Sequence, residues 1–287
     1  MSRFLVIVAL GITASGLCRA ESTINATNRH AYGGNIGWLD WRADGTNGAI
    51  IGDYVCSGSI YSANVGWIHL GSGSPANGIR YQNNSATDYG VNHDGLGNLS
   101  GFAYGANIGW IQFEAQGAPT VDLKTGRLGG AIYSANCGWI SLSNAIAGVQ
   151  TDHLSPGLLD GNGLPLTWEI ENFNNKGIDP NDDPDNDGQS NAEEYLAGTD
   201  PLDADSNLRI LSLQLQADGT KAVVRWTSVL NRLYYLQSSE DLSLPMWLDS
   251  GLGLTVPDGT ATERSVNNPL LPQRFFRVQA VRPLSLY

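Results

Sequence analysis

The stretch Tyr133-Ser-Ala-Asn-Cys-Gly-Trp-Ile140 is one of four closely similar segments in the first half of the chain. The other copies are Tyr32-Gly-Gly-Asn-Ile-Gly-Trp-Leu39, Tyr61-Ser-Ala-Asn-Val-Gly-Trp-Ile68 and Tyr104-Gly-Ala-Asn-Ile-Gly-Trp-Ile111. Each copy alternates apolar residues around an Asn and a Gly, which is typical of two short strands joined by a tight turn. Repetition of such a unit predicts that residues 21–149 form one antiparallel β domain of hairpin repeats.

The tryptophans of these copies occupy one equivalent position in each repeat, which favours a role in the core or between repeats. Trp41 lies outside the repeated pattern. An indole that is free of the repeat can stack on a sugar ring, so Trp41 is a candidate for ligand stacking.

The composition excludes two classes of protein. Gly 35 and Pro 12 make the chain rich in turns, and only 15% of its residues are charged. Disordered chains combine low hydrophobicity with high charge, and coiled coils are dominated by Ala, Glu, Lys, Leu and Arg. A folded, mainly β protein remains.

Residues 1–20 have the pattern of a secretory signal peptide, with Arg3, an apolar run and a final Ala20. Removal of Arg3 and Arg19 takes the formal net charge from −12 to −14. So acidic a chain predicts no nucleic-acid partner. No later run reaches the ~18 apolar residues of a transmembrane segment. We therefore expect a protein that is secreted or held at the outer surface of a cell.

The pattern changes near residue 150. Residues 164–173 and 191–197 read as two short helices, the second followed by Gly198 in the usual stop position. From Leu208 onward, short runs alternate with period two, which predicts a small β-sandwich over residues 207–287. The expected fold is mainly β, with a β-hairpin repeat domain at 21–149, a loop–helix segment at 150–206 and this C-terminal sandwich.

A calcium loop is predicted immediately before the second helix. Oxygen-bearing residues occupy its positions 1, 3, 5, 9 and 12, with Gly188 at position 6 for the sharp turn. Calcium takes six to eight oxygen ligands, and three neighbouring carboxylates would repel one another without a cation. The predicted ligands are Asp183, Asp185, Asp187, the backbone carbonyl of Gln189, Asn191 and Glu194.

Two weaker acidic patterns flank this loop. Asp200, Asp203 and Asp205 either hold a second metal ion or are simply solvated. The stretch from Leu158 to Glu169 looks like a degenerate loop that lacks its first ligand. Both alternatives stay open for each pattern.

The cysteines and the catalytic motifs give less information. Cys56 and Cys137 form either one disulfide, as an exported protein permits, or two buried thiols. The sequence contains no Gly-x-Ser-x-Gly elbow and no phosphate-binding loop, and its four histidines lack metal-ligand spacing. We therefore expect no enzyme.

Residues Trp168-Glu169, Asp183 to Tyr195 and Gly198-Thr-Asp-Pro201 resemble the thrombospondin type 3-like and EF-hand or dockerin-like calcium segments of secreted bacterial proteins. The aromatic repeats are similar to those of bacterial surface proteins. The resemblance implies a calcium cofactor, and the repeats bring with them no activity that can be assigned to this chain.

The expected function is that of a secreted, calcium-binding modular protein with a structural or adhesive role at the cell surface. Its partner would be a polysaccharide or another surface protein. The alternatives are a carbohydrate-binding protein that uses aromatic residues of the repeats, and a secreted hydrolase with an unrecognised carboxylate site.

Overall fold

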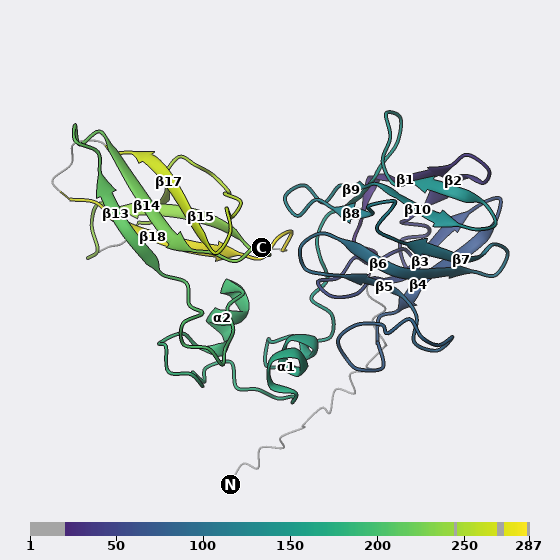
Figure 1. Ribbon diagram of the computed structural model, residues 1–287, viewed down its shortest axis with the longest axis horizontal. Coiled ribbons are helices and arrows are strands. Elements are labelled where there is room, and N and C mark those ends of the chain that lie inside the picture. Colours follow the sequence, from purple (N-terminus) through teal and green to yellow (C-terminus); the bar gives the residue numbers. More distant parts are fainter. Residues whose placement is uncertain (1–20, 244–245, 269–272, 286–287) are drawn as a thin grey trace, which may run out of the picture.

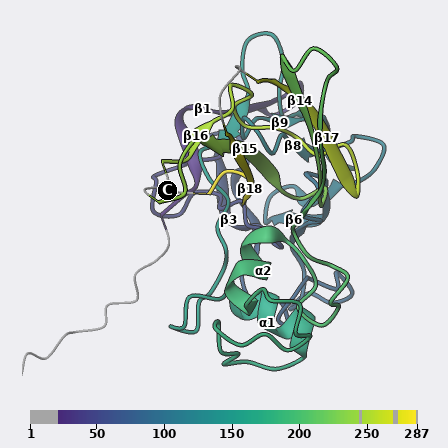
Figure 2. The same cartoon turned by 90° about the vertical axis from the view of Figure 1, so that its left-hand side faces the viewer.

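The computed structural model describes residues 21–243, 246–268 and 273–285, so the expected signal peptide at 1–20 lies outside the described residues. Within these ranges the chain is mainly β and has two helices, α1 (Leu166–Phe173) and α2 (Asn191–Ala197). Figure 1 shows a barrel of N-terminal strands, a segment that contains the helices, and a smaller β part made by the C-terminal strands. In the view turned by 90°, both helices lie together below the β parts (Figure 2).

Eight antiparallel strands close into the barrel. Their order around it follows the chain, and the last strand pairs with the first through Ser141 with Tyr32 and Ile140 with Gly33. The barrel strands are β1 (Ile24–Gly33), β2 (Gly37–Asp40), β3 (Ser57–Ser62), β4 (Gly66–Ser72), β6 (Leu99–Gly105), β7 (Gly109–Phe113), β10 (Ala131–Ser134) and β11 (Gly138–Ser141). Short strands add to this frame, namely β5 (Val91–His93) beside β6, β12 (Val149–Thr151) beside β1, and the pair β8 (Thr120–Val121) and β9 (Leu128–Gly129).

Each sequence repeat supplies two neighbouring barrel strands and the turn between them. The Tyr and Trp of one copy face each other across the strand pair, as Tyr32 and Trp38 do. The glycine before each Trp has φ between 71° and 76°, a conformation that glycine adopts without strain. Strand direction alternates around the barrel, so all four of these turns lie at the same end.

Layers of apolar side chains fill the barrel, with one residue from each copy in each layer. Side chains alternate between the two faces of a strand, so the residue after each exposed Trp points inward. One buried layer is Leu39, Ile68, Ile111 and Ile140, and their strand partners Ala31, Ile60, Ala103 and Ile132 form the next. At the turn end, the buried residues between Asn and Gly are Ile36, Val65, Ile108 and Cys137.

The predicted arrangement, a hairpin-repeat domain joined to a β-sandwich, was wrong. The repeats form a closed barrel, because the pairing of β11 with β1 joins the last copy to the first. Closure removes the unpaired edges that an open array of hairpins would leave. Four copies give eight strands, a number at which side chains alone can fill the interior.

The C-terminal residues form two separate three-stranded antiparallel sheets. Trp226 and Tyr234, one from each sheet, are buried, and their ring centroids lie 6.2 Å apart. The first sheet contains β13 (Ile210–Leu215), β14 (Lys221–Thr227) and β17 (Ala261–Asn267), and the second contains β16 (Leu248–Asp249), β15 (Leu233–Ser239) and β18 (Phe275–Val281).

The two helices pack against each other through aromatic side chains. Trp168 of α1 contacts Tyr195 of α2, with ring centroids 5.7 Å apart, and both side chains are buried. Helix α2 begins after Ser190, whose N–H donates to Glu193 Oε2 at 2.9 Å, and it ends at Gly198 with φ of 77°. Neither helix of the described ranges is long and apolar enough to span a membrane.

Candidate metal site

The acidic loop before α2 brings three aspartates together. One carboxylate oxygen of each of Asp183, Asp185 and Asp187 lies within 4.8 Å of the other two. Gly188 turns the chain with φ of 93°, and its N–H donates a hydrogen bond to Asp183 Oδ2 at 3.0 Å. Since like charges at this separation repel one another, the three aspartates form a group that could hold a metal ion.

Glu194 approaches the same group from the first turn of α2. Its side chain is buried. Its pKa is raised to about 7, first by burial and then by the negative charges of Asp185, Asp187 and Asp183. The pKa of Asp185 is also raised, by desolvation first and by the charges of Asp187 and Asp183. The charges of the three loop aspartates therefore act on the carboxyl of Glu194 on the helix.

Four oxygens of the predicted metal ligands are shielded from solvent and lack a hydrogen-bond partner among the described residues. They are Asp183 Oδ1, Asp185 Oδ2, Asn191 Oδ1 and Glu194 Oε2. Asn191 Nδ2 donates to the Asp179 carbonyl oxygen at 2.8 Å, so only its acceptor end lacks a partner. An unpaired buried polar group costs about 1–3 kcal/mol, and an unpaired set that consists only of acceptors suits a cation.

The degenerate loop before α1 provides an internal comparison. Glu169 is as fully buried as Glu194, but it accepts hydrogen bonds from Asn162 Nδ2 (2.8 Å), Ile178 N–H (3.0 Å) and Gly177 N–H (3.1 Å). Asn162 Nδ2 also contacts Asp160 Oδ2 at 3.0 Å. An amide nitrogen thus lies among the oxygens of this loop. Glu194, by contrast, accepts only from Thr199 Oγ1 at 3.3 Å.

Among the remaining predicted metal ligands, Gln189 belongs to the acidic loop, but the aspartates of the predicted second metal site do not come together. Gln189 donates its N–H to Asp187 Oδ1 at 2.7 Å, which holds it within the loop. The three exposed aspartates proposed for a second metal ion do not converge, because the acidic group around Asp183 is the only one of three or more carboxylates found among the described residues. Two of these aspartates instead accept backbone N–H groups in local turns. The three are Asp200, Asp203 and Asp205.

Two other predicted site features are corrected by burial. Trp41 is 0% exposed and packs against Phe113 with ring centroids 6.4 Å apart, so it has no free face for a ligand. Cys56 and Cys137 are free thiols, both buried, and the disulfide alternative is therefore wrong. Burial raises the pKa of Cys56 to about 12.

The repeat tryptophans were expected in the core or between repeats, and the prediction of a core position was wrong. Their exposed fractions are 48%, 40%, 43% and 46% for Trp38, Trp67, Trp110 and Trp139, respectively. The sequence held the signal that was missed. In each copy Trp is followed by Leu or Ile, and two adjacent strand residues face opposite sides of a sheet.

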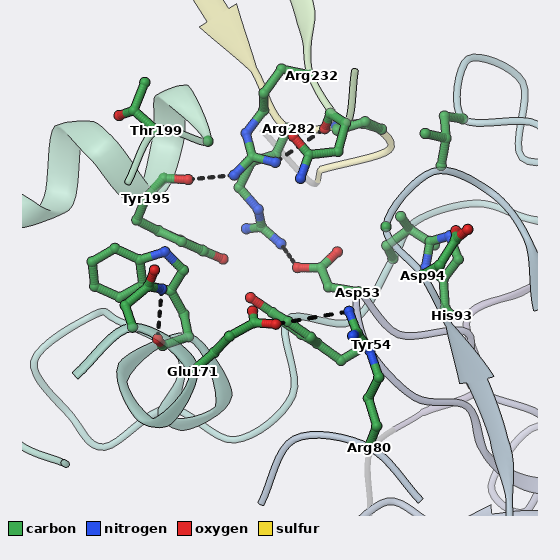
Figure 3. A pocket seen from close by; sticks show the side chains of 18 residues that line it. Asp53, Tyr54, Arg80, His93, Asp94, Glu171, Tyr195, Thr199, Arg232 and Arg282 are labelled. Carbon is green, nitrogen blue, oxygen red and sulfur yellow. Dashed lines mark hydrogen bonds and ion pairs between the residues drawn. The ribbon is translucent and has the colours of Figure 1, made fainter. Parts of the chain in front are cut away.

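A cavity of about 220 Å³ lies where the barrel, the helices and the C-terminal sheets meet. Arg282, at the end of the C-terminal part, forms an ion pair with Asp53 of the barrel (Figure 3). The Arg282 guanidinium also lies over the Tyr195 ring of α2, 4.8 Å from its centroid. Arg232 donates to the carbonyl oxygens of Tyr195 (2.6 Å) and Leu196 (2.8 Å). Helix α2 is therefore hydrogen-bonded to the C-terminal part. Its Tyr195 ring also contacts Arg282, the residue that pairs with Asp53 of the barrel.

Two of the three carboxylates that line this cavity lie beside arginines, and the third, Asp94, accepts hydrogen bonds from Leu96 and Asn98. Asp53 is paired with Arg282, and Glu171 lies 3.9 Å from Arg80. His93 is buried, with Nδ1 2.9 Å from the Gly52 carbonyl oxygen. Burial lowers the pKa of His93 and keeps the ring neutral. The geometry supports a junction between parts of the molecule.

No family model, no curated protein and no solved structure matches this chain.

Proposed function

We propose that this protein is a non-catalytic, calcium-binding modular protein in which a bound ion fixes α2 at the junction between the barrel and the C-terminal sheets. The observation that carries the proposal is the contrast between two fully buried glutamates. Glu169 accepts hydrogen bonds from three N–H groups of the protein, whereas Glu194 faces three aspartates and has an oxygen without a partner among the described residues. A divalent cation supplies the positive charge that Glu194 lacks.

The donor set favours calcium over magnesium. Three aspartates, a glutamate able to bind through both oxygens, an asparagine and a backbone carbonyl approach the six to eight oxygens that calcium takes. Magnesium prefers a strict octahedron and retains several waters. All these donors are oxygens, which are poor ligands for zinc relative to cysteine and histidine.

The proposed consequence of binding is mechanical. Glu194 and Tyr195 are adjacent on α2, so an ion on Glu194 fixes the helix turn that carries Tyr195. Tyr195 lies under Arg282, which pairs with Asp53 of the barrel. Extracellular calcium modules bind at roughly 10⁻⁴–10⁻³ M, so calcium outside a cell would keep the junction rigid. This suits a structural or adhesive protein that is exported to the surface of a bacterial cell.

Thermal unfolding in calcium and in chelator tests the proposal. A ligand at 100 times its Kd stabilises the folded state by about 2.7 kcal/mol, so calcium should raise the Tm of the wild type. Asp185→Asn should abolish the shift, while Asp203→Asn, the same charge change at an exposed position, should keep it. No shift in the wild type, or an equal shift in Asp185→Asn, would refute calcium binding at this loop.

A further inference from the structure

The outer wall of the barrel carries four aromatic pairs that the calcium site does not involve. In each repeat, Tyr and Trp lie directly opposite each other on neighbouring strands. Their ring centroids are 4.9, 5.0, 4.9 and 5.1 Å apart in the pairs Tyr32–Trp38, Tyr61–Trp67, Tyr104–Trp110 and Tyr133–Trp139, respectively. Each indole is nonetheless 40–48% exposed. Large aromatic faces open to water at four equivalent places differ from isolated surface apolar residues, which need no explanation.

A polar side chain of the preceding repeat lies beside each pair. The register between repeats puts Asp40 opposite Tyr61 and His69 opposite Tyr104. It likewise puts Gln112 opposite Tyr133, and Ser141 opposite Tyr32 across the closure of the barrel. Directly opposed residues of an antiparallel pair point to the same face. Each aromatic platform therefore combines an exposed indole, tilted by 56–62° from the paired Tyr ring, with a neighbouring hydrogen-bonding group.

We infer that these four platforms bind a neutral polysaccharide. A sugar ring has an apolar C–H face, which packs on an indole, and a rim of hydroxyl groups, which hydrogen-bond to polar neighbours. Each platform offers that combination. The inference stands independently of the calcium proposal, since no platform residue belongs to the acidic loop.

Charge favours a neutral ligand over a charged polymer. Three of the four polar neighbours are Ser141, Gln112 and His69. The fourth, Asp40, lies 3.4 Å from Arg29 in an ion pair. Residues 21–154 contain five Lys or Arg and nine Asp or Glu, a net charge of −4. An anionic polymer would meet no basic patch, and a cationic one would find no acidic side chain free at the platforms.

The arrangement around the barrel favours a chain over a flat partner. The four pairs face outward in different directions, so a flat surface of a second protein covers only part of the set. A polymer can follow the wall and contact neighbouring platforms, and contacts linked in this way raise avidity well above single-site affinity. The platform at Trp110 is the most extensive, because Tyr89 and Phe102 also lie against its indole, at 4.9 and 6.0 Å between centroids.

Sedimentation with insoluble polysaccharides tests the inference. The probes are cellulose, chitin, β-1,3-glucan, mannan and starch granules, each with calcium and with chelator. We expect the wild type to bind at least one of them in both conditions. Trp110→Ala should weaken that binding about tenfold, as expected for a lost contact of about 1.4 kcal/mol. Trp110→Phe, which keeps an aromatic face, should restore most of it.

Ile146→Ala is the matched control, because it removes an apolar side chain that is 87% exposed on the barrel and belongs to no platform. It should bind as the wild type does. Failure of the wild type to sediment with all five probes would overturn the inference, as would equal binding by a Trp67→Ala/Trp110→Ala double variant. Sedimentation velocity that shows a dimer dissolved by that double variant would assign the platforms to self-association and also overturn it. Loss of binding only in chelator would contradict its independence from calcium.

Discussion

Asn35 of the first repeat donates a hydrogen bond from Nδ2 to the carbonyl oxygen of Cys137 in the fourth repeat, at 3.1 Å. The same asparagine of every other copy bonds the turn of the copy before it. These contacts are Asn64 to Ile36 (3.0 Å), Asn107 to Val65 (3.1 Å) and Asn136 to Ile108 (2.9 Å). The four bonds form a closed ring around the turn end of the barrel, so the repeated Asn joins neighbouring copies as well as shaping its own turn.

Removal of one member of this ring should destabilise the barrel. Asn107→Ala deletes one inter-repeat hydrogen bond, and we expect a loss of about 1 kcal/mol, measured as a lower urea midpoint by indole fluorescence. Asn84→Ala, at an exposed loop position, should leave the midpoint unchanged. Equal midpoints for Asn107→Ala and the wild type would mean that the ring contributes nothing to stability.

The two cysteines should behave as buried thiols. Both lack a disulfide, and burial raises the pKa of Cys56 to about 12, so little thiolate is present at neutral pH. We expect a thiol reagent to label neither residue in the native protein and both after unfolding in urea without reductant. Labelling that requires prior reduction would show a disulfide and contradict the structure.

The calcium-free protein should lose stability as pH rises from about 4.5 to about 7. The pKa of Glu194 is raised from 4.5 to about 7 by burial and the nearby aspartates, so between these values the folded state holds more protons than the unfolded state. Stability then falls with rising pH. Urea unfolding in chelator at several pH values measures this slope, which Glu194→Gln should reduce. A slope that Glu194→Gln leaves unchanged would place its origin elsewhere.

The ion pair between Arg282 and Asp53 should couple the C-terminal part to the barrel. In a double-mutant cycle of Arg282→Ala and Asp53→Ala, contacting residues typically show interaction energies of about 0.5–3 kcal/mol. Urea unfolding of the four proteins gives this energy, and Arg209→Ala, at an exposed position, serves as the control. Strictly additive effects of the two substitutions would indicate that the pair does not join the two parts.

The sequence predicted local features better than it predicted the closure of the barrel or the burial of side chains. Short-range rules predict the turns, the period-two strands and the helices at 164–173 and 191–197. In the structure, α1 lies within the first of these ranges and α2 coincides with the second. Closure of the barrel depends on the pairing of Gly33 with Ile140, over 100 residues apart in the chain, which no local pattern specifies. The spacing of the acidic loop did predict that Asp183, Asp185 and Asp187 converge.

The prediction failed where exposure is a tertiary property. Trp41 and Trp38 are three residues apart, yet one is fully buried and the other 48% exposed. The exposed candidate position was therefore predicted for the buried Trp41. The separation between Asp183 and the exposed Asp203 is similarly invisible in composition, because both belong to the same acidic stretch. Whether a buried carboxylate accepts hydrogen bonds from several N–H donors, as Glu169 does, or lacks them, as Glu194 does, is visible only in three dimensions.

Calcium binding at the loop before α2 can be measured by calorimetric titration of calcium into chelator-treated protein. The comparison is between the Glu194→Gln and Glu169→Gln variants. Both substitutions remove one charge from a fully buried glutamate next to a loop, but only the first removes a proposed ligand. We predict saturable binding at the Asp183–Glu194 loop in the wild type and in Glu169→Gln, and its loss in Glu194→Gln. No binding by the wild type at millimolar calcium, or unchanged binding by Glu194→Gln, would rule out a calcium site that uses Glu194.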